Sequence, residues 1–368
     1  MNNEGISARR ITCSIHQQIS DQLVSRIRTM GISVPIFMES CRSVRQIQRP
    51  RPMGIPGSRL ILDDSPGNRI FITAPSDCAE SIMHLLVDAA ALHLPGHGSI
   101  FEQDISLFDE FPDPSACLPN HRQSDAAFLK DLSLITCIVS NPGAGEQIAE
   151  TALELGTCVP TITLGIGTGI RDKLGLLRIT IPPEKELVHL LVPSHDSEGI
   201  VQLLIEHSRM NRPGGGFLYC TPVRSGIIDT RLRIGKQEHP ASIEQIIAAI
   251  DEMKQGTSWR KRFVESTRSG ARMMRRNTEI TIICREGYAD RIVEAAMQAG
   301  AAGATVSRLK RIGAGTEESA ARERCIITVP AGTADNTIQA VLQAKREHQD
   351  YVDTVELLKA PLAYAYQS

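Results

Sequence analysis

Apolar and polar residues follow one order along the chain, and this order occurs three times. Each occurrence opens with an apolar run that has the alternation of a strand and contains a cysteine: Cys13, Cys137 or Cys284. A segment with apolar residues at helical spacing follows each run. It ends at a glycine, Gly31, Gly156 or Gly300, as a helix with a left-handed C-cap requires.

Four more segments complete each occurrence: a second and a third strand, a second amphipathic helix and a last strand. The third strands are expected at 69–74, 186–192 and 325–329, and the last strands at 99–108, 217–223 and 354–358. The order βαββαβ predicts the α+β class, as three tandem ferredoxin-like units. Because strands with apolar residues on both faces must be covered on both, we expect a compact intramolecular pseudo-trimer with its sheets inside and its helices outside.

These patterns divide the chain into domains at 8–110, 131–228 and 278–368. The connection at 229–277 is expected to be helical and basic, with Ser242 as a helix N-cap and Gly256 at the helix end. The basic residues after this helix are Arg260, Lys261, Arg262, Arg268, Arg272, Arg275 and Arg276. They indicate an exposed, partly paired helix face, and binding of an anionic partner is the alternative.

Composition narrows the class of protein. The chain has 368 residues, 42% of them hydrophobic and 22% charged, as in a multidomain globular protein. No apolar run approaches the roughly 18 residues of a membrane span, so we expect a cytoplasmic protein that does not insert into membranes. A net charge of −2 gives no signal for nucleic-acid binding. Nine cysteines without a C-x-x-C pair favour reduced thiols.

The candidate chemistry lies in the middle domain. Gly214, Gly215 and Gly216 remove every Cβ from one turn, so backbone N–H groups there could converge on an anion. A tight turn before a strand is the alternative interpretation. Beyond this domain lie Arg231 and Arg233, whose spacing in an extended chain would place both guanidinium groups on one side of a polyphosphate.

Several motifs together resemble the PII-type nitrogen regulatory proteins. In the middle domain these are a glycine-rich loop at 165–169, Glu-Lys-Glu-Leu-Val at 184–188 and Pro-Gly-Gly-Gly-Phe at 213–217. The first domain has Leu-Pro-Gly-His-Gly-Ser-Ile-Phe at 94–101, and the third resembles only the opening half of the family, at 299–306. The resemblance covers the middle domain best.

The resemblance implies a trimeric sensor that binds adenine nucleotide in clefts between subunits and regulates a partner through a long loop. The residues that it assigns to the nucleotide are Gly96, Gly98, Gly214, Gly215, Gly216, Glu186, Thr305, Arg231 and Arg233. The glycines and arginines would hold phosphates, and Glu186 would lie near the adenine. Glu186 in a surface ladder with Glu184, and the two arginines as the start of the connection, are the alternatives.

The chain also departs from the family. Phe217 replaces the lysine that ends the phosphate loop, and the third domain lacks the closing glycine turn. We therefore expect a divergent, monomeric, non-enzymatic regulator. Its expected effector is ATP, ADP or AMP, its expected partner is an enzyme or transporter, and no cofactor or metal is required. The alternatives are an interaction scaffold with decayed sites and a weak nucleotide hydrolase. The segment 49–68, with four prolines and three glycines, is expected to be a mobile loop that contacts the partner.

Overall fold

The computed structural model describes residues 5–29, 34–50, 58–109, 111, 126–169, 184–208, 210–212, 214–229, 271–312 and 321–366. These residues form twelve strands, six α-helices and one short 3₁₀ helix, so the α+β class is confirmed. We call β1–β4 with their helices the N-terminal third, β5–β8 the middle third and β9–β12 the C-terminal third.

The bounds of the elements are as follows. The N-terminal third comprises β1 (Ile6–His16), α1 (Gln17–Thr29), β2 (Ile36–Pro50), β3 (Ser58–Pro75), α2 (Ser76–Ala90) and β4 (Gly98–Leu107). The middle third comprises β5 (Leu129–Val139), α3 (Ala144–Glu154), β6 (Thr161–Gly169), β7 (Glu184–Pro193), α5 (Ser197–His207) and β8 (Phe217–Ile227). The C-terminal third comprises β9 (Ala271–Arg285), α8 (Ala289–Gln298), β10 (Gly303–Ile312), β11 (Ala321–Pro330), α9 (Ala331–Glu347), η2 (Gln349–Tyr351) and β12 (Val352–Tyr366).

Two of the expected helix ends are confirmed by their backbone. Gly156 and Gly300 have φ angles of 67° and 110°. Each glycine N–H bonds to a carbonyl of the preceding turn, and the next residue bonds to the carbonyl five positions before it. This is the Schellman arrangement, in which a residue without a Cβ reverses the chain at low cost. The third glycine, Gly31, lies outside the described residues.

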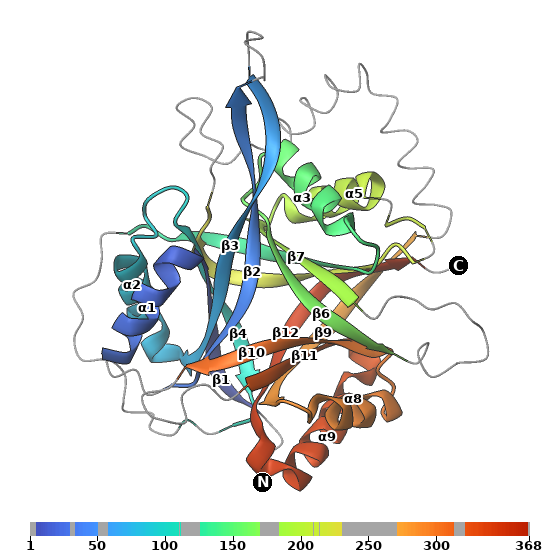
Figure 1. Cartoon of the computed structure of the whole chain (residues 1–368). Coiled ribbons are helices and arrows are strands. Elements are labelled where there is room, and N and C mark those ends of the chain that lie inside the picture. The colour runs from blue at the N-terminus through green and yellow to red at the C-terminus, as the bar shows by residue number, and fades with distance from the viewer. Residues whose placement is uncertain are drawn as a thin grey trace.

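The strands of each third pair in the same antiparallel order: β4-β1-β3-β2, β8-β5-β7-β6 and β12-β9-β11-β10. The three groups join in two closed circuits. The second strands contact one another through β2–β10, β10–β6 and β6–β2, and the last strands through β4–β8, β8–β12 and β12–β4. Each third therefore touches both others. In Figure 1 the helix pairs α1/α2, α3/α5 and α8/α9 lie on the outside with the strands between them.

An apolar cluster lies between the helices and the strands of each third. Representative buried members are Ile11, Leu23 and Leu86; Ile135, Ile148 and Val201; and Ile280, Ile292 and Val341. The opposite faces of the strands are also buried and carry polar side chains besides smaller apolar clusters. On β1, Ile11, Cys13 and Ile15 face the apolar cluster, whereas Arg10 and Thr12 alternate with them and are also buried. The expectation of apolar residues on both faces is therefore confirmed only in part: the inner faces carry buried ion pairs as well as apolar side chains such as Phe71 and Ile283.

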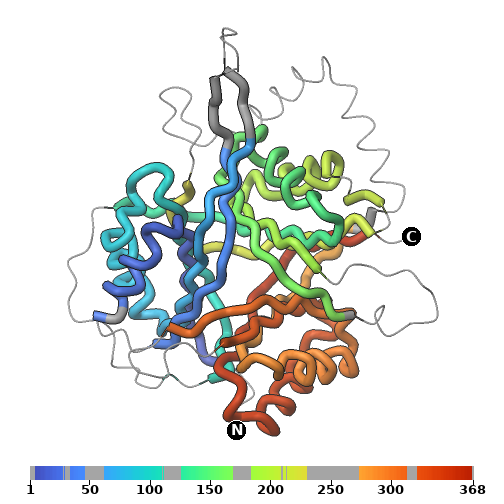
Figure 2. The backbone as a smooth tube through the Cα atoms, viewed as in Figure 1, coloured from blue at the N-terminus to red at the C-terminus, as the bar shows by residue number. Residues whose placement is uncertain are grey.

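The segment 49–68 is not a plain loop. β2 and β3 form a long antiparallel hairpin whose register continues as far as Pro50 and Ser58. In Figure 2 these two strands run together away from the rest of the chain. Pro50 is compatible with this ladder because it ends β2, past the residues that pair with β6 and β10, where a missing N–H costs little. The residues between the two strands lie outside the described residues.

Two other expectations need correction. β9 begins at Ala271, ahead of the boundary expected at 278, so Arg272, Arg275 and Arg276 lie in a strand rather than on a helix. The extension is stabilised by pairing with the end of β12, in which Leu362 lies opposite Arg275. The helix expected between Ser242 and Gly256, and the rest of the basic run, lie outside the described residues.

The expectation of reduced thiols holds only in part. In the described part of the chain seven cysteines are free, and the three that open the thirds are buried as small apolar residues. Cys78 is disulfide-bonded. Among the described helices, none is both long enough and apolar enough to span a lipid bilayer.

Candidate functional site

The two glycine turns singled out in the sequence have the same backbone. Gly96 and Gly98 have φ angles of 84° and 141°, and Gly214 and Gly216 have φ angles of 76° and 115°. A Cβ on Gly98 would lie 2.0 Å from a carbonyl oxygen of β1, and one on Gly216 would lie 2.5 Å from a carbonyl oxygen of β5. Both turns therefore need glycine for backbone conformation and for close contact with the first strand of their own third.

The first turn is closed by a carboxylate from the middle third. The Gly96 N–H donates to Asp229 Oδ1 at 3.0 Å, and Arg45 Nη2 donates to the Gly96 carbonyl at 3.0 Å. Arg45 and Asp229 also form an ion pair at 3.6 Å, and all three residues are buried. An internal carboxylate thus accepts the N–H group that an anionic ligand would use.

A second aspartate closes the contact between the N-terminal and C-terminal thirds. Asp109 follows the end of β4, as Asp229 follows the end of β8. Its Oδ2 accepts the Val355 N–H at 2.9 Å, near the start of β12, and its Oδ1 contacts Lys345 Nζ. Burial raises the pKa of Asp109, although Lys345 and the Val355 N–H act in the opposite direction. An aspartate paired with a basic residue therefore lies at two of the three contacts between the last strands of the thirds.

The turn at 214–216 is the more open one. Gly214 is exposed, whereas Gly96 is buried. Within the turn, the Gly215 N–H donates to the Arg212 carbonyl at 2.9 Å, so this N–H stabilises the turn itself. Phe217 begins β8 opposite Ala365 of β12, which places the turn at the contact between the middle and C-terminal thirds. Arg231 and Arg233 lie outside the described residues, and their convergence on this turn stays a prediction.

Glu186 has a structural role that the sequence pattern did not indicate. Its Oε2 accepts the Gly145 N–H at 2.9 Å, at the start of α3, and its Oε1 accepts a hydrogen bond from Arg42 Nη2 at 2.9 Å. Glu323 makes the equivalent contact with α8, because its Oε2 accepts the N–H of Ala289, the first residue of this helix, at 3.1 Å, and that of the preceding Gly287 at 2.9 Å. A carboxylate at a helix N-terminus accepts hydrogen bonds from the free N–H groups there and interacts favourably with the helix dipole. Glu186 therefore belongs to a helix cap, and its expected contact with adenine is untested.

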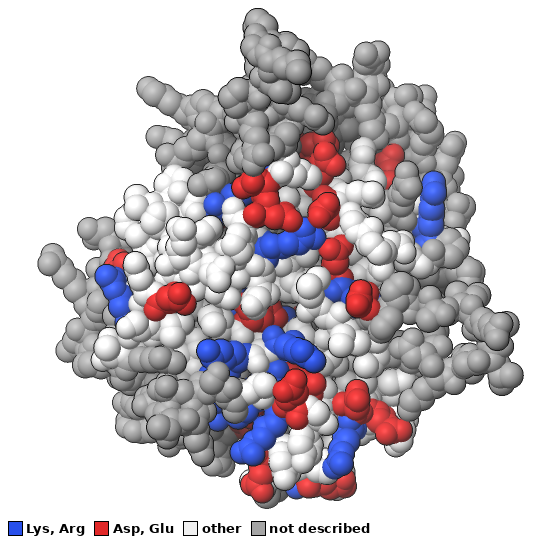
Figure 3. Space-filling model, viewed as in Figure 1, with Lys and Arg blue, Asp and Glu red and all other residues white. Residues whose placement is uncertain are grey.

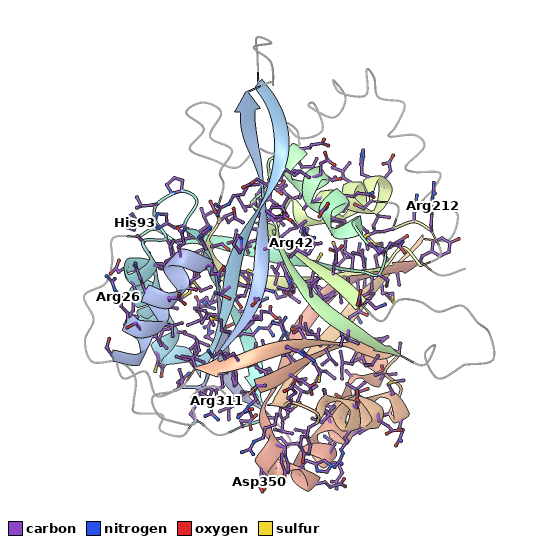
Figure 4. All side chains as sticks on the ribbon, viewed as in Figure 1. Arg26, Arg42, His93, Arg212, Arg311 and Asp350 are labelled. Carbon is purple, nitrogen blue, oxygen red and sulfur yellow. The ribbon has the colours of Figure 1, made fainter. Side chains whose placement is uncertain are left out.

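Arg42 joins this cap to a wider ionic group. It also contacts Asp64 at 2.5 Å and Glu146 at 2.9 Å. Figure 4 shows Arg42 near the base of the β2–β3 hairpin, and Figure 3 shows carboxylates gathered round a basic side chain on this face. Three carboxylates for one arginine make this surface acidic. Among the described residues no group of histidine, cysteine and acidic side chains could hold a metal ion.

Thr305 lies in β10, at a position where this strand pairs with β6. It is buried, and its methyl carbon would lie 2.9 Å from a Cβ on Gly165. The glycines at 165–169 are therefore part of strand β6 rather than a loop, and their small size lets β10 approach closely. Thr305 and the turn at 214–216 thus both lie where the middle and C-terminal thirds meet, on different strand pairs.

The sequence pattern gave no indication of the charged interior. Arg10 Nη2 donates to Glu279 at 2.9 Å and to Gln103 at 3.0 Å, and Arg10 Nη1 lies 3.5 Å from Glu356. Burial opposes ionisation of Glu279, but Arg10 and neighbouring hydroxyl groups lower its pKa overall. Burial raises the pKa of Glu356, which accepts a hydrogen bond from Thr73. These residues come from β1, β3, β4, β9 and β12 and so link two thirds.

His189 brings the middle third into this interior. Its ring nitrogens lie 3.4 Å and 3.2 Å from the hydroxyl groups of Thr136 and Thr163. Burial, with additional repulsion from Arg69, Arg324 and Arg10, lowers the pKa of His189 well below its ordinary value. The imidazole is therefore neutral in the folded protein at physiological pH.

A loss of stability in acid follows from His189. Its folded-state pKa is depressed, so the unfolded chain binds more protons as the pH falls through about 6.5, and stability decreases by up to about 1.4 kcal/mol per pH unit. In His189→Gln, which can still bond to both threonines, we expect a smaller decrease between about pH 6.5 and 5. Urea denaturation across this range measures the slopes. Replacing the exposed His93 with glutamine is the control, and equal slopes for all three proteins would exclude His189 as the cause.

Comparison with known proteins identifies no relative. No protein-family model and no curated protein sequence matches the chain. Solved structures show weak likeness. A microcompartment protein from Desulfitobacterium hafniense DCB is 12% identical, with a TM-score of 0.18, over 62% of this chain and 95% of its own.

Two enzymes show likeness of the same kind. An aldoxime dehydratase is 8% identical, with a TM-score of 0.28, over 64% of this chain and 82% of its own. Aspartate kinase from Synechocystis is 10% identical, with a TM-score of 0.22; the alignment covers 96% of this chain but only 45% of the kinase. TM-scores this low give no basis for transferring a fold or a function to the chain.

Proposed function

We propose that the chain is a non-enzymatic, PII-like regulatory protein built from three tandem ferredoxin-like units that form an intramolecular pseudo-trimer. Its effector is an adenine nucleotide or a small anion, bound at the contact between the middle and C-terminal thirds. The repeated strand order β4-β1-β3-β2 and the two closed circuits of strand pairs support the pseudo-trimer.

The main support for the proposal is that, of the two matching glycine turns, one is closed by an internal carboxylate and the other is exposed. In the N-terminal third an internal carboxylate, Asp229, accepts the N–H of the turn, which shows that this backbone geometry suits an anionic oxygen. In the middle third the matching turn is exposed at Gly214. The open turn is therefore where an external phosphate or carboxylate has access.

A protein partner fits the same arrangement. The β2–β3 hairpin extends from the body and starts beside the acidic group around Arg42. A protruding hairpin offers backbone and side-chain surface to another protein without disturbing the sheets that carry it. We propose an enzyme or transporter as the partner, in line with the resemblance to PII-type regulators.

An interaction scaffold with decayed sites is the second candidate. Two aspartates favour it, because Asp229 and Asp109 occupy two of the three contacts between last strands, the first in a buried ion pair and the second in a partly buried one. Binding of nucleotide at the remaining contact separates the two candidates.

Equilibrium titration with ATP, ADP and AMP tests the proposal. We expect binding at millimolar concentration or below, and a loss of about tenfold or more in Gly215→Asp, because a new carboxylate in the open turn repels phosphate. His97→Asp places the same charge in the closed turn and is expected to bind like the unchanged chain. No binding by the unchanged chain would leave the scaffold as the better account.

Nucleotide hydrolysis is tested with the same unchanged chain and the same Gly215→Asp variant. Under single-turnover conditions, with protein in excess over nucleotide, we expect no hydrolysis product. Product that forms in the unchanged chain but not in Gly215→Asp would instead support the weak hydrolase.

A further inference from the structure

The inner faces of the three thirds enclose a cavity of about 20 Å³. This is room for one water molecule or a single-atom ion, and a nucleotide is far too large for it. The titratable side chains that line it are Arg10, Arg69, Arg324, Glu279, His189 and Tyr219. The arginines and Glu279 come from the N-terminal and C-terminal thirds, and His189 and Tyr219 come from the middle third.

The charge of Arg10 is already balanced. Its guanidinium donates to Glu279 at 2.9 Å, and the same carboxylate accepts a hydrogen bond from Thr281 at 2.9 Å. Interaction with Arg10 keeps Glu279 ionised despite its burial, as the lowered pKa of this carboxyl indicates. Glu279 and Arg10 therefore form a neutral pair.

Arg69 and Arg324 share a single carboxylate. Arg69 Nη1 and Arg324 Nη2 each donate to the same oxygen, Glu39 Oε1, at 3.1 Å. The other oxygen of Glu39 accepts a hydrogen bond from Ser307 at 3.2 Å. Two guanidinium groups thus face one negative charge, and all three charged side chains are at most 5% exposed.

The donors of these two arginines are not all used. The Nε atoms of Arg69 and Arg324 are buried and have no hydrogen-bond partner in the described part of the chain. Both guanidinium groups lie against the ring of Phe71, at 5.2 Å and 4.4 Å from its centroid. The ring positions the two groups but accepts no conventional hydrogen bond from them.

Tyr219 and His189, which also line this cavity, do not supply the missing negative charge. Burial raises the pKa of Tyr219 well above its ordinary value, so the phenol is neutral. His189 is neutral as well. Burial also raises the pKa of Glu356, which lies beside Arg10 rather than beside Arg69 or Arg324. The region around Arg69 and Arg324 carries an excess positive charge, which is costly when buried without a partner.

We propose that this cavity binds a small monovalent anion, of the size of chloride or bromide, between Arg69 and Arg324. The anion balances the positive charge that Glu39 leaves uncompensated, beside the two arginine side chains that line the cavity. It also connects the thirds, because Arg69 lies in the N-terminal third and Arg324 in the C-terminal third, with His189 of the middle third on the same cavity.

Thermal unfolding and crystallography test the site. The unfolding midpoint of the full chain is measured in sodium chloride, sodium bromide and sodium gluconate at equal ionic strength, because gluconate is too large for the cavity. With chloride at about a hundredfold its Kd, we expect a midpoint about 3–4 °C higher than in gluconate. Crystals grown in sodium bromide are expected to show anomalous density between the two guanidinium groups.

Two variants separate a specific site from a general salt effect. Arg324→Met leaves Arg69 paired with Glu39 and removes the excess charge, so the difference between chloride and gluconate should disappear. Arg324→Lys keeps the charge and should retain it. Equal midpoints in chloride and gluconate for the unchanged chain, or bromide density only at surface positions, would overturn the proposal. The bromide crystal needs no variant and decides the question even if Arg324→Met does not fold.

Discussion

Replacing Arg10 with alanine is expected to lower the free energy of unfolding by about 3–5 kcal/mol. Arg10 is 8% exposed, and its guanidinium bonds to Glu279, Gln103 and Thr281, each on the inner face of a sheet. Without it, Glu279 keeps a buried negative charge with no cation beside it, which is costly. Urea denaturation at pH 7, fitted with a common m-value, measures the change.

Arg275→Ala is the matched control for this change. Arg275 also forms an ion pair, at 2.7 Å with Glu198, but it is 68% exposed and its partner is 53% exposed. Exposed pairs contribute less than about 1 kcal/mol because water solvates both groups when the pair is broken. A loss in Arg10→Ala no larger than in Arg275→Ala would show that the interior is hydrated and that the Arg10 contacts stabilise little.

The order of elements could be predicted from the sequence because it depends on local periodicity. Alternation placed strands near β1, β5 and β9, and the C-cap glycines Gly156 and Gly300 placed the ends of two helices. The same alternation gave the wrong environment for the polar face. On β1, the alternation shows that Arg10 and Thr12 lie on the face of the strand that points away from the apolar core. Periodicity cannot tell whether that face contacts water or other strands.

In the candidate site, too, the local features could be predicted from the sequence and the long-range contacts could not. Glycine at 96, 98, 214 and 216 marks turns, since the left-handed backbone is a local property. Closure of the first turn by Asp229 depends on a contact between residues 133 positions apart. The helix-cap contact of Glu186 is likewise to a residue 41 positions away, and that of Glu323 in the C-terminal third to one 36 positions away, so local periodicity could not reveal either.

Gly98→Ala is expected to destabilise the chain by about 2–5 kcal/mol, from backbone strain and from overpacking together. The φ angle of Gly98 is 141°, and an added Cβ would lie 2.0 Å from the Ser14 carbonyl oxygen, so β4 would have to separate from β1 where β4 begins and β1 ends. Gly143→Ala isolates the backbone contribution, because Gly143 has a φ of 77° with nothing within 4 Å of the new Cβ, and should cost about 1–2 kcal/mol. Urea denaturation of both variants measures the difference. If the two alanines cost the same, the close approach of β4 to β1 contributes nothing, and the glycine at 98 serves only the conformation of the turn.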